Sequence, residues 1–109
     1  MTSWTDLVRL RIYTGESARI DGLPAYEHIV RAAHAAGLAG ATVLRGMMGF
    51  SGHSEIHTAK ILRLAEDLPI LIEIIDSMEK IEAFCDSEVV RIGLCLVTRD
   101  CVQVKVYRV

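Results

Sequence analysis

The residues best able to do chemistry lie in one stretch, GFSGHSEIHTAK, which spans positions 49–60. His53 and His57 stand four residues apart, a spacing that would place both imidazoles on one face of a helix, within reach of one metal ion. On an extended strand their Cα atoms would lie about 13 Å apart, which is too far for chelation. Gly49 and Gly52 disfavour a helix here, and HSEIH is not the HExxH pattern of zinc proteases. We therefore expect no metal site.

The same stretch could form an anion site. Successive backbone N–H groups of a glycine-rich turn can bind a phosphate, and the residues that could present them are Gly46, Gly49, Ser51, Gly52 and Ser54. Arg45 and Lys60 would add positive charge. The P-loop pattern GxxxxGK[ST] is absent, so a simple glycine turn remains the alternative.

Catalysis would need a nucleophile with a base, or a cluster of acids and bases, and the spacing of residues specifies neither. Cys85 falls on the apolar stripe of an expected helix, so packing explains it better than reactivity does. We predict no catalytic residues. An enzyme built on this chain would have to use Glu16, His53, Glu55 and His57.

Length and charge restrict the class of protein further. The chain has 109 residues, which suits one domain, and we expect that domain to span positions 1–109. A net charge of −2 and a pI near 6.0 provide no basic surface for a nucleic acid. Three cysteines without a C-x-x-C spacing indicate reduced thiols. The first residues contain neither a basic leader nor a long apolar run, so we expect a cytoplasmic protein.

The first half of the chain has the pattern of a strand, a helix and a second strand. Val8, Leu10 and Ile12 alternate with polar residues, as in a half-buried strand. A helix is expected between Pro24 and Gly37, and its apolar stripe is Tyr26, Ile29, Val30 and Ala33. A second strand is expected within positions 39–50, which contain β-branched residues punctuated by glycines.

The second half repeats the pattern. A strand is expected at 69–76, followed by a helix that opens at Asp76 in a capping box with Glu79 and ends at Gly93. A short strand at 94–98, a turn at 99–100 and a last strand should complete the chain. The buried stripe of the second helix is predicted to be Met78, Ile81, Cys85, Val89 and Ile92.

The order βαββαβ is that of the ferredoxin-like α+β fold, in which two helices cover one face of an antiparallel sheet. The other face should be amphipathic, as faces buried in oligomers often are. We expect it to carry Arg9, Arg11, Gln103, Lys105 and Tyr107, with Val102, Val104 and Val106 turned the other way. About twenty residues separate the second strand from the third, and connections of that length tend to be functional.

Nearly the whole chain resembles a bacterial and archaeal family known as domain of unknown function 190. The most specific stretches are AGATVLRG (39–46), HTAKIL (57–62) and EDLP (66–69). The resemblance implies a small ferredoxin-like protein similar to the trimeric PII signalling proteins, with a long loop between the second and third strands. Genes of this family often lie near fluoride-channel genes.

RGMMGFSGHSEIH (45–57) also resembles the PII segment that leads into the long T-loop. In PII proteins this loop and the clefts between subunits bind ATP or ADP with 2-oxoglutarate, and the loop docks onto transporters or enzymes. This chain departs from PII in three ways. It has no tyrosine between Phe50 and Pro69 for uridylylation, Phe50 replaces the glutamine that helps to hold metal and 2-oxoglutarate, and the TGxxGDGK phosphate loop is missing.

We therefore predict a PII-like regulatory homotrimer that binds a small anionic or nucleotide ligand at its subunit clefts and signals through positions 50–68. The candidate cofactor is an adenine nucleotide, and the expected partner is a membrane channel, a transporter or an enzyme. Alternatives are a small enzyme that uses the cleft His and Glu residues, or a structural subunit of an ion channel. The ligand-binding residues should be Arg45, Gly49, Ser51, Gly52, His57 and Lys60.

Overall fold

The computed structural model describes residues 3–50, 57–58 and 67–108. The main elements are β1 (Thr5–Gly15), α1 (Ala25–Ala35), β4 (Gly40–Arg45), β7 (Pro69–Asp76), α2 (Met78–Ser87) and β8 (Leu96–Val104). The minor elements are β2 (Arg19–Ile20), β3 (Leu23–Pro24), β5 (Met48–Gly49), β6 (His57–Thr58) and the 3₁₀ helix η1 (Val89–Ile92).

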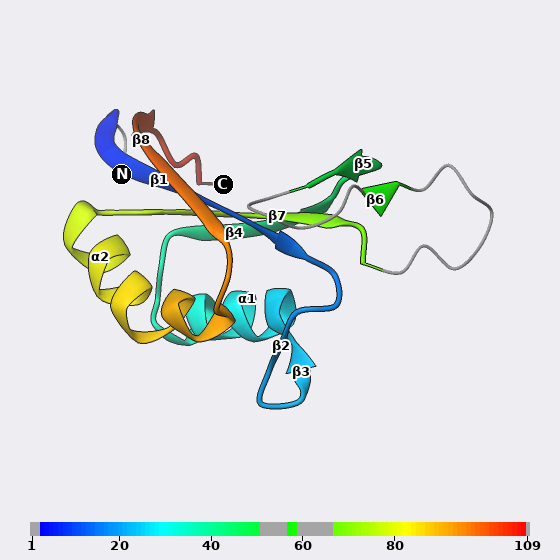
Figure 1. The fold of residues 1–109 in the computed structure, drawn as a ribbon. Coiled ribbons are helices and arrows are strands. Elements are labelled where there is room, and N and C mark those ends of the chain that lie inside the picture. Colours follow the sequence, from blue (N-terminus) through cyan, green and yellow to red (C-terminus); the bar gives the residue numbers. More distant parts are fainter. Residues whose placement is uncertain (1–2, 51–56, 59–66, 109) are drawn as a thin grey trace.

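The four long strands form one antiparallel sheet in the order β4-β7-β1-β8. Both α-helices lie on the same side of this sheet (Figure 1). Two small antiparallel pairs, β2 with β3 and β5 with β6, lie outside it, and β5–β6 lies beyond the end of the sheet that is opposite α2 (Figure 1). The predicted ferredoxin-like α+β fold is confirmed.

The core lies between the sheet and the helices and is almost entirely aliphatic. Alternate positions of β1 and β7 point into it, as the period of two predicted. Its main buried side chains are Val8, Leu10, Ile12, Ile29, Ala33, Ile70, Ile72, Ile74, Ile81 and Phe84. Burial of an aliphatic side chain of this size stabilises a fold by about 1.5–3 kcal/mol, so these two strands contribute much of the stability. No helix in the described part of the chain is long and apolar enough to cross a membrane.

The start of the second helix differs from the prediction by one residue. Ser77, not Asp76, is the N-cap, and its Oγ accepts a hydrogen bond from Lys80 N at 3.3 Å. Asp76 stays in β7, where its carboxylate accepts hydrogen bonds from Ala39 N (2.8 Å) and Ser77 N (2.6 Å). The carboxylate thus joins the loop before β4 to the end of β7. Met78, predicted to be buried, is 40% exposed, whereas Phe84, which was not predicted to be buried, lies in the core.

The predicted turn at Arg99–Asp100 is wrong, because β8 runs through both residues without a break. Arg99 pairs with Leu10 in the register and Asp100 pairs with Arg9. The two side chains therefore point to opposite faces of an edge strand, where each finds a partner of opposite charge. Arg99 forms an ion pair with Glu82, and Asp100 binds Arg9 at 2.6 Å.

The assignment of β8 residues to the two faces is also partly wrong. Directly opposed residues of antiparallel strands share a face. Val102 pairs with Leu7, which puts it on the same open face as Arg9, whereas Gln103 pairs with Asp6 on the helix side. The open face thus combines apolar residues with the ion pairs Arg9–Asp100 and Arg11–Glu73; its apolar residues include Leu7, Leu44, Leu71, Val102 and Val104.

The end of β1 is held to the start of β7 by contacts between residues 15–17 and 67–69, which we call the strand-end clamp. Glu16 N donates a hydrogen bond to Leu68 O at 2.9 Å, and Ser17 N donates one to Asp67 Oδ1 at 2.9 Å. Asp67 has a positive φ of 63°, and Gly15 leaves room for its side chain, because a Cβ on Gly15 would lie 2.3 Å from Asp67 Oδ1. A side chain at position 15 would therefore displace the aspartate.

We predict that Gly15→Ala lowers the free energy of unfolding by about 1–3 kcal/mol, because the new methyl group forces Asp67 away from its contact with Ser17. Gly40→Ala is the matched control, since it is also a strand glycine but a Cβ there meets no atom within 4 Å. The control should stay within about 0.5 kcal/mol of the wild type. Urea unfolding at one protein concentration compares them, and equal losses in both variants would contradict the clamp.

Candidate functional site

A cavity of about 240 Å³ opens where β1 ends and β7 begins, beside β5. We call it the strand-end cavity. Its walls come from three parts of the chain that the sheet and the strand-end clamp bring together, and they include Tyr13, Thr14, Gly46, Met48, Gly49, Phe50 and Pro69. Thr14 is buried, whereas Met48 and Phe50 are 64% and 65% exposed. The cavity thus has a fixed floor and an apolar, accessible rim.

Gly46 allows a close approach of two chain segments at this site. Gly46 N donates a hydrogen bond to Pro69 O at 2.7 Å, and a Cβ on Gly46 would lie 2.9 Å from Pro69 Cγ. A Cβ on Gly49 would lie 3.4 Å from the same atom. The amide of Gly46 is therefore already used within the fold, and it is not one of the free donors that the glycine-rich pattern suggested for an anion.

The structure brings two of the predicted site residues together. Gly49 and His57 are direct partners in the β5–β6 pair. Arg45 is the last residue of β4, and its guanidinium forms an ion pair with Glu16 at 3.0 Å across the end of the sheet. Ser51, Gly52 and Lys60, and the side chain of His57, lie outside what the structure describes. Their roles stay predictions.

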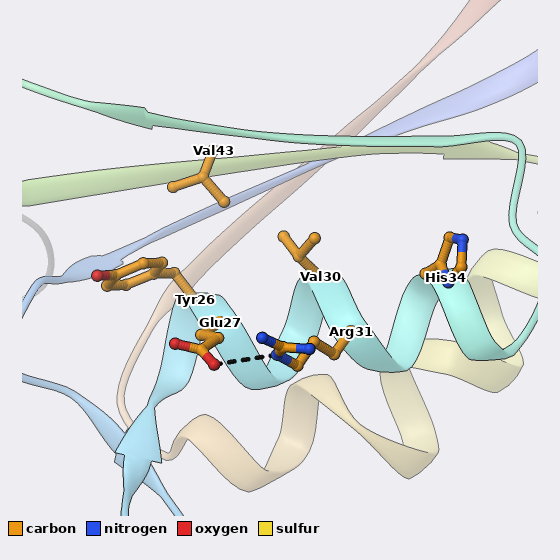
Figure 2. A pocket seen from close by; sticks show the side chains of 6 residues that line it. All are labelled: Tyr26, Glu27, Val30, Arg31, His34 and Val43. Atoms are coloured by element: carbon orange, nitrogen blue, oxygen red, sulfur yellow. Dashed lines mark hydrogen bonds and ion pairs between the residues drawn. The ribbon is translucent and has the colours of Figure 1, made fainter.

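Sequence reasoning missed a second cavity, of about 600 Å³, between α1 and the edge strand β4. Figure 2 shows Tyr26 and Val30 of α1 facing Val43 of β4, with Glu27 and Arg31 joined beside them. That ion pair measures 3.0 Å, so its two charges satisfy one another. Tyr26 and Val30 fall on the apolar stripe that the sequence predicts, but in the structure both are only half-buried. A predicted core stripe that is left partly uncovered is the sequence signal for this cavity. This cavity has no part in the strand-end site.

Two cysteines are poor nucleophiles in this environment. Burial raises the pKa of Cys85, with Asp86 and Cys95 adding to the effect, and burial also raises the pKa of Cys95. Both side chains pack against the core, whereas Cys101 is exposed on β8. Among residues 3–50 and 67–108, no group of three His, Cys, Asp or Glu side chains could hold a metal ion.

The fold is that of PII-like proteins. The chain superimposes with a TM-score of 0.68 and 16% identity on CPII, a nitrogen regulatory PII-like protein from Thiomonas intermedia K12 bound to ADP, AMP and bicarbonate, covering 95% of this chain and 92% of CPII. A candidate PII-like signaling protein from Thermus thermophilus gives a TM-score of 0.61 with 16% identity, covering 95% and 93% of the two chains.

Residues 7–104 match the DUF190 family (Uncharacterized ACR, COG1993), and the chain belongs to this family. A UPF0166 protein from Aquifex aeolicus is 40% identical over 77 residues, which are 71% of this chain and 73% of the relative. UPF0166 protein MJ1524 from Methanocaldococcus jannaschii is 32% identical over 94 residues, covering 84% and 86%. The resemblance inferred from the sequence is confirmed.

We predict that iodoacetamide alkylates Cys101 of the native protein well before Cys85 and Cys95, because the two half-buried thiols have raised pKa values and less thiolate at mildly alkaline pH. Peptide mass spectrometry at successive times measures the order of labelling. In urea the three sites should react at similar rates, which serves as the control. If Cys85 of the native protein were labelled as fast as Cys101, the Cys85 thiol would be neither half-buried nor raised in pKa.

Proposed function

We propose that this protein is a PII-like regulatory protein of the cytoplasm. It assembles as a homotrimer, binds a small anionic ligand, with an adenine nucleotide as the leading candidate, and signals to a partner protein through positions 50–68. The partner is a channel, a transporter or an enzyme. The observation that carries the proposal is the strand-end cavity, whose rim ends at Phe50, where that segment begins. The ADP and AMP bound to the structurally similar CPII support the nucleotide class.

The chemistry of the cavity suits a flat ring joined to an anion. Met48 and Phe50 offer apolar and aromatic contact to a base, and aromatic stacking tolerates any planar ring. Arg45 precedes Gly46 of the cavity wall and supplies a guanidinium, which recognises phosphate well. Gly49, Ser51, Gly52, His57 and Lys60 remain the other proposed ligand contacts.

The size of the cavity supports a site shared between subunits. Its volume of about 240 Å³ is below the range of about 300–1,000 Å³ usual for small-molecule sites, so a nucleotide would extend beyond one chain. The open face of the sheet supplies an interface, because its apolar residues surround two ion pairs. The Arg9 guanidinium, which hydrogen-bonds to Asp100, holds the pKa of that carboxyl below its usual value, so this pair stays charged at neutral pH.

We predict that ADP and AMP bind to the wild-type protein in isothermal titration calorimetry and that Phe50→Ala weakens ADP binding at least about fivefold. The reason is the loss of stacking, which contributes about 1–3 kcal/mol per base. Tyr107→Ala is the control, since Tyr107 is also an exposed aromatic residue (79%) but does not line the cavity. Absence of binding by either nucleotide would remove the nucleotide from the proposal.

We predict that Val102→Lys prevents trimer formation, because it places a charge on the open sheet face among apolar residues. Gln103→Lys is the matched control, since the neighbouring position points to the helix side, opposite Asp6. Light scattering after size exclusion should give a trimer for the wild type and the control, and a monomer for Val102→Lys. A trimer that survives Val102→Lys would place the interface elsewhere.

A further inference from the structure

The charge that would bind an anion is already neutralised within the chain. Arg45 Nη1 lies 3.0 Å from Glu16 Oε2, and this contact joins the end of β4 to the residue after β1. The two partners differ in exposure: 61% of the Arg45 side chain is accessible, against 25% for Glu16. The arginine can therefore reach solvent or a ligand, whereas the carboxylate is mostly covered.

The position of Glu16 is set by its backbone and not by the ion pair. Its N–H bonds to Leu68 O, and the next N–H, that of Ser17, bonds to Asp67 Oδ1. Both contacts belong to the strand-end clamp, which would persist if Arg45 turned away. The backbone of Glu16 is thus held in place without the ion pair, and its carboxylate is the less exposed of the two charged groups.

Resting on the proposed function, we infer that Glu16 is an internal competitor for the anionic group of the ligand. Its carboxylate pairs with Arg45, and a phosphate displaces it by taking over the guanidinium. Binding then exchanges one partner of Arg45 for another. The contribution of Arg45 to the binding free energy is therefore the difference between its contact with the ligand and its contact with Glu16. A phosphate carries more negative charge than a carboxylate and has oxygens for two parallel hydrogen bonds. It therefore replaces the carboxylate as the partner of Arg45. A singly charged carboxylate gains little, because the Glu16 contact that must be given up is the same for every anion that uses Arg45.

The test is calorimetric titration of ADP and of adenosine, which lacks phosphate. Glu16→Gln removes the charge and keeps the size of the side chain, and it should tighten ADP binding about twofold to fivefold, since exposed ion pairs contribute about 0.2–1 kcal/mol. Adenosine binding should not change. Glu27→Gln is the matched control, because Glu27 pairs with Arg31 at the same distance of 3.0 Å beside the other cavity.

A double-mutant cycle separates competition from plain repulsion between Glu16 and the ligand. If Glu16 competes for Arg45, adding Glu16→Gln to Arg45→Gln changes ADP affinity no further. If the carboxylate only repels the phosphate, the gain from Glu16→Gln persists without the arginine, and the inference is wrong. It is also wrong if the wild type binds ADP and Glu16→Gln does not tighten it. If neither the wild type nor Glu16→Gln binds ADP, the proposed function is contradicted as well. That outcome differs from ADP binding that Glu16→Gln does not tighten, which contradicts the inference alone.

Discussion

The strand-end clamp joins the two chain segments from which the floor of the proposed site is built. Hydrogen bonds from Glu16 to Leu68 and from Ser17 to Asp67 hold the end of β1 against the start of β7. This contact fixes Pro69, over which Gly46 passes at a distance that only glycine permits, and so it forms the floor of the strand-end cavity. It also keeps Glu16 beside Arg45. The same few contacts thus bear on both the shape of the cavity and the placing of the Glu16–Arg45 pair.

The sequence predicts the fold well where one face of an element is buried. In β1 and β7, alternate residues pack on the helices, so the period of two is visible in the sequence. The prediction fails in β8, which is an edge strand and largely exposed on both faces. There, Arg99 and Asp100 resemble a turn, because their partners, Glu82 and Arg9, are distant in the sequence.

The site could be predicted only in part, for a similar reason. The glycine-rich stretch points to Arg45 and Gly49, and the structure places Gly49 in the wall of the strand-end cavity and Arg45 next in the chain to the wall residue Gly46. Sequence spacing could not show that Glu16, the residue after β1, pairs with Arg45, nor that the Gly46 amide is taken by Pro69. The glycines suggested an anion nest, whereas in the fold Gly46 allows two segments to approach closely.

The central claim is that a nucleotide binds at the strand-end cavity and changes the partner of Arg45. The most direct test is the change in backbone amide chemical shifts when ADP is added to ¹⁵N-labelled protein. We expect the largest shifts at positions 13–17, 45–50 and 67–71, the segments that form the cavity and the clamp. Shifts confined to the cavity between α1 and β4, or no shifts at saturating ADP, would contradict it.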